Sequence, residues 1–396
     1  MLNDFLTYLC QTSPEPLALE IERAEGIYLY TKDGRRYVDF ISGIGVANIG
    51  HGHPAVRAAI VQQLAKHLHV MVYGEYVQEA QVKFAKRLCE LAPIDDGVVF
   101  FCNSGAEAIE GALKTARKFT GRTKYVAFEG GYHGDTFGAL SAMSSAYYRK
   151  PFEPLLGEFE FFPFDDLNAL QRIDDSVAAV LFEPVQGEAG VRVPSQNFLS
   201  ALRERCNAVG ALMIADEVMT GFGRTGKLFA CEHWNVRPDI MCLAKALGGG
   251  LPLGAFIGRR EIMQTLSQNP PLAHVTTFGG HPLSCAAGLA ALEVLFEEKM
   301  IERSARNGEQ FLSRLRQELH EHKAVKEVRG LGSFFAIEFQ NEHATQQFVQ
   351  NCRAAGLIIG WTLHRTTVVR AAPPLCMNGE EVQDALAIIY EAMKAL

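Results

Sequence analysis

The sequence predicts an α/β fold in which a mostly parallel sheet is covered by helices, and three observations lead to this prediction. From about residue 98 onward, apolar runs alternate with amphipathic segments of helical periodicity. These apolar runs are continuous, as expected for strands buried on both faces. The chain has 396 residues, of which 48% are hydrophobic and 21% charged, so it can bury a sizeable core. One large domain with a smaller one is the division that this length favours.

The amino-terminal part is expected to form a hairpin followed by a helix. The segment GIYLYTKDGRRYVDFIS is typical of two strands joined by a turn at Asp33 and Gly34. After it, PAVRAAIVQQLAKHL predicts a helix. His51 and His53, in the intervening HGHP, are either a pair of metal ligands or part of a polar turn, and the turn is favoured.

The middle of the chain supplies the predicted parallel strands and the helices between them. The strands are, in order, VVFFC, KYVAFEG, VAAVLFEPV, ALMIADEV and IMCLAK, and the helices are SGAEAIEGALKTARKF and QNFLSALRERCNAVG. Ligands in such folds bind beyond the carboxyl ends of the strands. The residues that follow each strand are therefore the candidate site.

The carboxy-terminal part has a different pattern. AVKEVRGLGSFFAIEF and GLIIGWTLHRTTVVRAAPPL alternate as the strands of an antiparallel sheet packed on helices do. The change predicts three units. They are an N-terminal segment, residues 1–50, that packs with the small domain, a large ligand-binding domain, residues 51–290, and a C-terminal small domain, residues 291–396.

Composition narrows the classes of partner. The formal net charge is -7 and no basic cluster exceeds a normal solvated helix face, which argues against nucleic acid and anionic membranes. The start, MLNDFLTYLC, contains Asp4 and has no basic region or cleavage site, so no signal peptide or anchor is expected. Nine cysteines without a CxxC pair suit a reducing cytoplasm rather than disulfides or a metal site.

Two strand ends offer charged or hydrogen-bonding groups to a ligand. After VVFFC, Asn103 or Ser104 caps a helix whose free N–H groups suit a phosphate, with an ordinary capped helix as the alternative. After ALMIA come Asp216 and Glu217, and a buried carboxylate there needs a partner. That partner is either an arginine in a structural salt bridge or a protonated heterocyclic nitrogen.

Two further strand ends offer an amine and an aromatic surface. Lys245 follows IMCLA, where desolvation lowers the pKa of a lysine and makes its amine a nucleophile; the alternative is a snorkelling side chain. Tyr132 and His133, in EGGYHGDT, offer a flat face, with core packing as the alternative. Phosphate site, carboxylate, amine and ring together match one cofactor, pyridoxal 5'-phosphate.

A competing motif is GFGRTG, from Gly221 to Gly226, which has the GxGxxG pattern of dinucleotide-binding oxidoreductases. Its context does not fit, because residues 216–220 separate the strand from the glycines. Asp239 also stands before the next strand rather than after it. A non-enzymatic binding module is disfavoured as well, since it has no use for a buried amine beside a carboxylate.

Over residues 16–390 the chain resembles the class III, or omega, aminotransferases of pyridoxal-phosphate fold type I. The matching stretches include NSGAEAIEGALKTARKFTGR, LFEPVQGEAGV, ADEVMTGFGRTGKLFACEHWNVRPDIMCLAKALGGGLPLGAFIG, TTFGGHPLSCAAG and VVRAAPPL. The resemblance implies transamination between an omega-amino donor, of acetylornithine, ornithine or 4-aminobutyrate type, and a 2-oxo acid. It also implies a cytoplasmic homodimer with active sites at its interface.

The resemblance assigns roles to the candidate residues. It implies that Lys245 forms the Schiff base, that Asp216 pairs with the pyridine nitrogen, and that Val218 and Tyr132 lie on the two ring faces. Thr277 is implied to reach the phosphate of the partner subunit. The remaining residues implied to bind the cofactor are Ser104, Gly105, Ala106, His133 and Glu183, and those implied to bind substrate are Ile44, Asp135, Glu188 and Arg370.

Two departures bear on the substrate. Many members have an arginine for a substrate carboxylate where this chain has Asp135, and a glutamine where it has Met219. An aspartate repels a carboxylate and favours an amine or another cation. Arg149 or Lys150 either replaces the missing arginine or is simply solvated. GYHGDTFGALS resembles the diaminopelargonate-forming aminotransferases, which are one alternative, and a racemase or aminomutase on the same fold is another.

Overall fold

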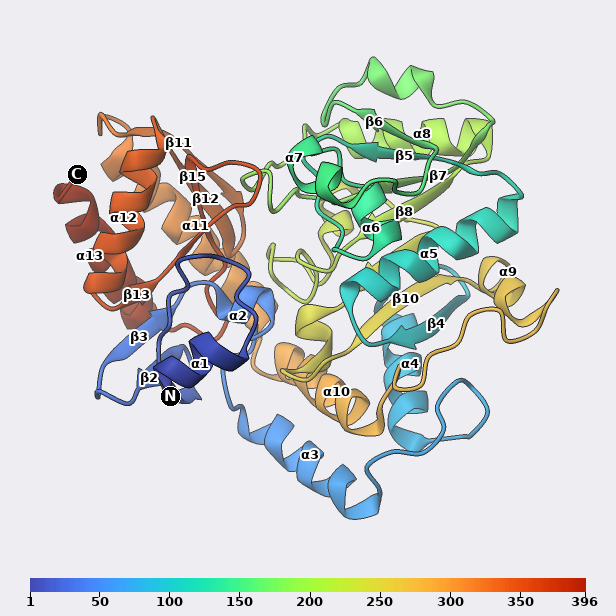
Figure 1. Cartoon of the computed structure of the whole chain (residues 1–396), viewed down its shortest axis with the longest axis horizontal. Helices are drawn as coiled ribbons and strands as arrows, with labels where there is room; N and C mark the ends of the chain where they lie inside the picture. The colour runs from blue at the N-terminus through green and yellow to red at the C-terminus, as the bar shows by residue number, and fades with distance from the viewer.

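The computed structural model describes all residues, Met1–Leu396. A seven-stranded sheet with its helices forms the larger part, and two four-stranded sheets lie in the smaller part beside it (Figure 1). No helix combines the length and the apolar character that crossing a bilayer requires.

The seven-stranded sheet has the order β4-β10-β9-β8-β7-β5-β6. Its strands are β4 Gly97–Cys102, β5 Lys124–Phe128, β6 Phe159–Phe162, β7 Val177–Phe182, β8 Leu212–Asp216, β9 Ile240–Leu243 and β10 Gly254–Arg259. All pairings are parallel except those of β10, which is antiparallel to β4 and to β9. The predicted mostly parallel sheet is therefore confirmed, and the carboxyl ends of β4, β7, β8 and β9 meet at one edge.

Strand β10 was not predicted, and the reason is local. It contains Gly254 and Gly258, which have low strand propensity, and its partners are supplied only by the folded sheet. A Cβ on Gly254 would lie 2.2 Å from the carbonyl oxygen of Ser104. Because Gly254 has no side chain, β10 can pass close to the start of the helix that follows β4, where the phosphate site is predicted.

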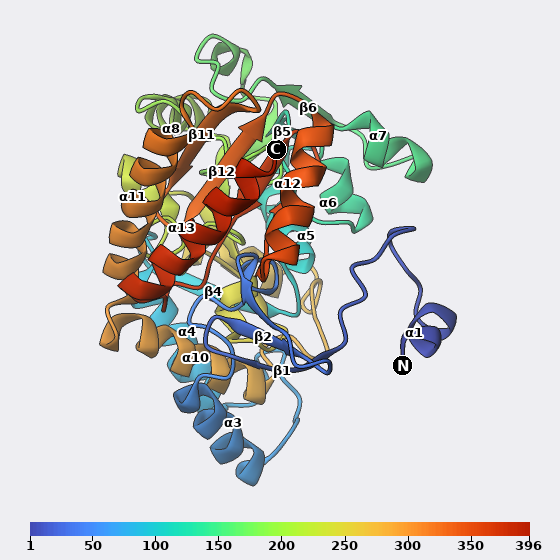
Figure 2. The ribbon, with the colours of Figure 1, turned by 90° about the vertical axis from the view of Figure 1, so that its left-hand side faces the viewer.

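Thirteen α-helices cover the sheets. They are α1 Leu2–Tyr8, α2 Ser42–Gly45, α3 Pro54–Lys66, α4 Glu79–Leu91, α5 Gly105–Thr120, α6 Phe137–Ser141, α7 Ala146–Arg149, α8 Phe198–Val209, α9 Arg260–Met263, α10 Pro282–Glu297, α11 Met300–Leu319, α12 Glu342–Ala354 and α13 Gly379–Lys394. Short 3-10 turns are η1 Lys150–Phe152, η2 Ala169–Arg172, η3 Ala230–Trp234, η4 Lys245–Gly248 and η5 Gln264–Ser267. Figure 2 shows α11, α12 and α13 side by side over one small sheet, with α1 standing away from the body.

The two ends of the chain share the smaller part. Strands β1 Ile21–Glu25, β2 Tyr28–Thr31 and β3 Arg36–Asp39 form the predicted hairpin and its extension, and β13 Leu357–Ile358 adds parallel to β3. The other sheet has the order β11-β12-β15-β14, with β11 Val325–Leu331, β12 Phe334–Phe339, β14 Gly360–Trp361 and β15 Val368–Ala371, all antiparallel. One core cluster joins Phe40 to Phe311 and Phe335, with ring centroids 5.6 Å and 6.5 Å apart. The domain boundaries themselves stay a prediction.

The GFGRTG motif forms a turn between β8 and η3 rather than a strand–helix junction, which agrees with the rejection of a dinucleotide site from its sequence context. Its Arg224 is fully buried. The guanidinium donates to the backbone oxygens of Ser333 and Pro373 and to the side chain of Asn48. This arginine therefore ties the N-terminal segment and the small sheet to the large part.

Both histidines of HGHP serve the local fold. His51 Nε2 lies 2.9 Å from an Asp39 carboxylate oxygen. The His53 side chain accepts a hydrogen bond from Ala55 N at the start of α3 and lies 3.0 Å from Glu298. The favoured interpretation, a polar turn before a helix, matches this arrangement.

Candidate active site

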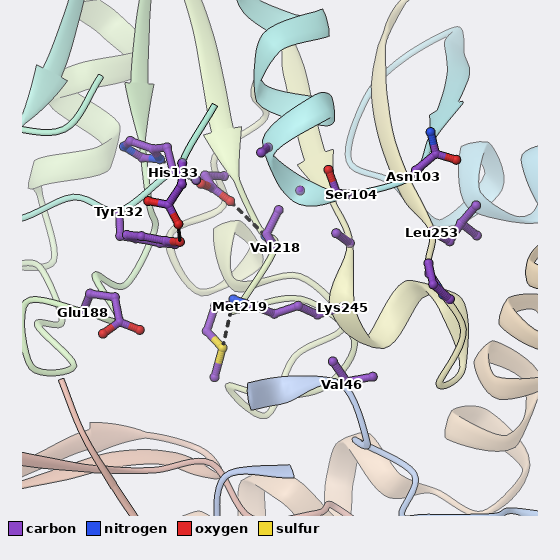
Figure 3. A pocket seen from close by; sticks show the side chains of 18 of the residues that line it. Val46, Asn103, Ser104, Tyr132, His133, Glu188, Val218, Met219, Lys245 and Leu253 are labelled. Carbon is purple, nitrogen blue, oxygen red and sulfur yellow. Dashed lines mark hydrogen bonds and ion pairs between the residues drawn. The ribbon is translucent and has the colours of Figure 1, made fainter. Parts of the chain in front are cut away.

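A cavity of about 650 Å³ lies at the carboxyl ends of the parallel strands. It is lined by most of the predicted site residues, namely Ser104, Gly105, Ala106, Tyr132, His133, Asp135, Glu183, Glu188, Asp216, Val218, Lys245 and Arg370. Figure 3 shows Lys245 in the middle of the cavity, with Ser104 to one side and Tyr132 and Glu188 to the other. The rule that ligands bind where parallel strands end brought these residues together correctly.

Lys245 stands two residues beyond β9 and has a strained backbone. Its φ is 50°, in the left-handed region that L-residues seldom adopt. Its Nζ lies 3.5 Å from the Met219 sulfur, a weak partner for a cation. Burial lowers the pKa of Lys245, and the charge of Arg370 lowers it further, against a partial opposing effect of nearby carboxylates. An amine held in this way has increased access to its nucleophilic, neutral form.

Asp216 ends β8 with its carboxylate buried, 5% exposed. One oxygen lies 2.8 Å from His133 Nδ1, and the other accepts the N–H of Val218 at 3.1 Å. A structural salt bridge to arginine, the alternative from sequence, is absent. The histidine fixes the orientation of the carboxylate toward the cavity.

The start of α5 faces the same cavity. Ser104 is the N-cap, and its hydroxyl accepts the N–H of Glu107 at 3.2 Å. The first N–H groups of a helix have no acceptor within it, and the dipole favours an anion there. A Cβ on Gly105 would lie 3.0 Å from Val218, so the helix start packs closely against the strand end that carries Asp216.

Glu183 organises two loops rather than presenting a free carboxylate. Its oxygens accept the N–H groups of Tyr132 and Gly187, each at 3.1 Å. Burial raises the pKa of Glu183 to about 7. Glu183 thus holds two loops in place, the one that carries Tyr132 and the one that carries Glu188.

Glu188 and Arg370 form an ion pair across the cavity. Glu188 also accepts the N–H of Leu363 at 2.9 Å. Burial by itself would raise the pKa of Glu188, but Arg370 and the Leu363 N–H outweigh it, so the pKa lies below its ordinary value. This carboxylate covers the guanidinium without occupying all of its donors.

Asp135 lines the cavity and accepts a hydrogen bond from the Tyr132 hydroxyl at 2.8 Å. Burial and this carboxylate together raise the pKa of Tyr132, so the phenol stays neutral. Arg149 and Lys150 do not line the cavity; the Arg149 guanidinium lies over the Phe161 ring, 5.1 Å from its centroid. The alternative that one of them replaces the missing arginine, which the sequence disfavoured, therefore finds no support in the cavity lining.

Ile44 and Thr277 do not line the cavity. Ile44 is 55% exposed on a turn with φ of 66°, and Val46 faces the cavity instead. Thr277 is exposed. Thr136, Gly187 and Leu253 are further lining residues that were not predicted, and their neighbours in sequence were the only signal for them. Asn103, the other candidate cap, and Met219, which stands where many relatives have glutamine, also line the cavity.

Pyridoxal phosphate fits the groups that line this cavity. Lys245 offers an amine with no carboxylate bonded to it, and Asp216 offers an oriented carboxylate. The start of α5 offers N–H groups for a phosphate. Val218 and Tyr132 present their side chains to the space between these groups (Figure 3).

Comparisons with known proteins identify the family of this chain. Residues 10–393 match the family model described as aminotransferase class-III. The chain is 45% identical to the acetylornithine aminotransferase of Methanopyrus kandleri, over 94% of this chain and 93% of that protein.

Two solved structures are similar throughout. One is the ornithine aminotransferase of Toxoplasma gondii with partial occupancy of PLP, with a TM-score of 0.91, 34% identity and coverage of 99% and 93% of the two chains. The other is a PLP-bound amine transaminase from an uncultivated Pseudomonas species, with a TM-score of 0.90, 28% identity and coverage of 98% of each chain.

Proposed function

This chain belongs to the class III aminotransferase family and is a pyridoxal-phosphate-dependent aminotransferase, and we propose that it transfers the amino group of an omega-amino donor to a 2-oxo acid. Acetylornithine, ornithine and 4-aminobutyrate are the donor types that we place first. The observation that carries the proposal is the Glu188–Arg370 pair in the same cavity as Lys245 and Asp216.

The residues that hold the cofactor are those that already face the cavity. Ser104, Gly105 and Ala106 bind its phosphate, Asp216 binds the ring nitrogen, and Lys245 is the covalent anchor. Val218 and Tyr132, which line the same cavity, would contact the two faces of the ring. When bound, the cofactor supplies an aldehyde that takes up an amino group and a ring that accepts electrons.

Asp216 and Lys245 are the side chains that we assign to the protons of the ring nitrogen and of the reacting carbon. Asp216 would pair with the ring nitrogen and favour its protonated form, and the His133 contact at 2.8 Å orients the carboxylate for this pairing. The Lys245 amine, once released from the cofactor, accepts the proton from the reacting carbon of the donor, and its lowered pKa suits that role.

Glu188 and Arg370 allow one cavity to accept two different substrates. With an omega-amino donor, Glu188 neutralises Arg370 and the cavity receives no carboxylate there. With a 2-oxo acid, Glu188 moves aside and Arg370 binds the carboxylate in a bidentate contact. In each catalytic cycle, Arg370 therefore exchanges Glu188 for the carboxylate of the oxo acid and then pairs with Glu188 again.

The assembly we propose is a cytoplasmic homodimer in which Thr277 reaches the phosphate site of the partner subunit. Thr277 is exposed and outside its own cavity, which supports this assignment. All nine cysteines are free, which is compatible with a reducing compartment.

A panel of amino donors tests the reaction. We expect omega-amino donors to convert the bound cofactor to its amine form in stopped-flow absorbance, and a 2-oxo acid to restore the starting spectrum. Oxo acid should be consumed in a one-to-one ratio with the donor, which a racemase or aminomutase does not do. Conversion by alpha-amines alone would overturn the omega assignment.

A further inference from the structure

A second cavity, of about 220 Å³, adjoins the active site. We call it the outer pocket; its lining residues are Asp135, Phe137, Leu140, Tyr148 and Phe152. Asp135 lines both cavities, so its side chain belongs to the wall that they share. A ligand that extends from Lys245 to Asp135 therefore reaches the border of the outer pocket.

Asp135 differs from the other carboxylates of the active site in having no charged or backbone partner. The others are held by a cation, a ring nitrogen or backbone N–H groups: Glu188, Asp216 and Glu183. The single hydrogen bond to Asp135 comes from the neutral Tyr132 hydroxyl and occupies Oδ2. Oδ1 has no protein donor and the residue is exposed, so a cationic ligand can replace solvent at this oxygen.

The walls of the outer pocket suit an alkyl chain that ends in a cation. Phe137 and Phe152 are 64% and 56% exposed, which is unusual for phenylalanine and typical of a binding surface. Aromatic faces attract ammonium groups as well as alkyl chains. The Tyr148 hydroxyl donates to Leu363 O at 3.0 Å, and Leu363 N donates to Glu188, so this wall is fixed to the Glu188 loop.

We propose that the outer pocket binds the far end of the amino donor, and that this far end is an ammonium group on an alkyl chain. The proposal rests on the omega-aminotransferase function proposed above and orders its donors: ornithine and linear diamines, which carry a second ammonium group, are preferred over 4-aminobutyrate, whose far end is a carboxylate. An ammonium group pairs with Asp135 Oδ1, whereas a carboxylate at the same place meets like charge.

Two donors of matched length test the charge preference. Putrescine and delta-aminovalerate carry the same reacting aminobutyl chain and differ in having an ammonium or a carboxylate at the far end. For the native enzyme we expect kcat/KM to favour putrescine by about tenfold or more, as one partly exposed ion pair allows. Asp135→Asn should reduce that preference to within about threefold, chiefly through KM for putrescine.

Equilibrium binding gives a second readout that does not need turnover. Tetramethylputrescine has only tertiary nitrogens and cannot condense with the cofactor. Calorimetry on the cofactor-loaded enzyme should show a dissociation constant about five to ten times higher for Asp135→Asn than for the native protein. Phe137→Ala, at an exposed position, should weaken binding about threefold because water then reaches the ion pair.

The control is Asp175→Asn, which removes an exposed carboxylate outside both cavities and should change neither measurement. Equal use of the two donors by the native enzyme, or an Asp135→Asn variant that keeps the preference, would overturn the outer-pocket proposal while leaving the omega function standing. If neither donor nor any other omega-amine converts the cofactor, the proposed function itself is wrong.

Discussion

Lys245 carries two marks of a functional residue that have independent physical causes. Its backbone φ of 50° costs an ordinary L-residue about 1 kcal/mol or more, which the surrounding fold must compensate. Its amine is desolvated beside Arg370 and finds only the Met219 sulfur as a partner. A lysine that merely extended to solvent would show neither feature.

We predict that Lys245→Ala abolishes covalent attachment of pyridoxal phosphate. Borohydride reduction followed by mass spectrometry should add the cofactor mass to the native chain and not to the variant, because no other amine lines the cavity. Lys227→Ala, at an exposed position, is the matched control and should label normally. A labelled Lys245→Ala protein would exclude Lys245 as the anchor.

At the residue scale, sequence identified side chains that follow a strand and missed those placed by tertiary contacts. Asp216 and Lys245 lie next to apolar runs, so their position at the sheet edge could be predicted. The turn at Ile44 is held by the Asp39 carboxylate, which accepts the N–H groups of Ile41 and Gly43. Nothing in the local sequence indicates that this turn directs Val46, not Ile44, into the cavity.

The element that most directly shapes the cofactor site is the start of α5. Ser104 caps the helix, and the tight approach of Gly254 brings β10 against the same turn. The sequence predicted the helix from its apolar periodicity and offered Asn103 or Ser104 as the cap, of which the structure has Ser104. The sequence did not predict β10, because this strand depends on pairing with β4 and β9. β4 is distant from β10 in the chain, and β9 is joined to β10 by a glycine-rich turn.

Ser104→Ala is expected to affect both stability and cofactor affinity. Loss of the cap leaves the Glu107 N–H without its acceptor and should lower the free energy of unfolding by about 1 kcal/mol in chemical denaturation. Loss of a hydroxyl at the anion site should also raise the dissociation constant of pyridoxal phosphate for the apoenzyme, about tenfold.

Ser145→Ala provides the control for this experiment. Ser145 is the N-cap residue of α7, but its side chain makes no capping hydrogen bond. Its replacement should leave the unfolding free energy and the cofactor affinity unchanged. If Ser104→Ala behaves like Ser145→Ala, the Ser104 hydroxyl contributes neither to the helix cap nor to binding of the phosphate.

At the scale of the whole molecule, the two chain ends and the large sheet form one structure around the cavity. β3 pairs with β13, and Arg224 joins Asn48, Ser333 and Pro373 from within its buried turn. Pro373 lies three residues after Arg370, so these contacts of Arg224 also help to fix the strand that carries Arg370, the arginine that we propose to bind substrate. The sequence predicted a mostly parallel sheet and a separate antiparallel sheet. It did not predict that the buried Arg224 connects the two parts by hydrogen bonds.

Exposed apolar side chains near Thr277 indicate a surface through which two subunits associate. Tyr76 and Val77 are 56% and 94% exposed, and Leu272 and Phe278 are 62% and 55% exposed. The two segments meet where the His69 ring packs on Phe278, with centroids 4.9 Å apart. Apolar residues gathered in this way are typical of an interface, and they flank Thr277.

Mixing two inactive variants tests whether Thr277 completes the site of the partner subunit. Lys245→Ala lacks the anchor, and Thr277→Asp places a negative charge where we expect the partner's bound phosphate. In a mixed dimer, one site combines an intact Lys245 with an intact Thr277 from the other subunit. After unfolding and joint refolding at equal amounts, activity should recover to about a quarter of the native value, because half of the dimers are mixed and each has one good site. Each variant refolded alone should stay inactive, and sedimentation should show dimers in all samples. If the mixture stays inactive while its dimers form, Thr277 acts within its own subunit or not at all.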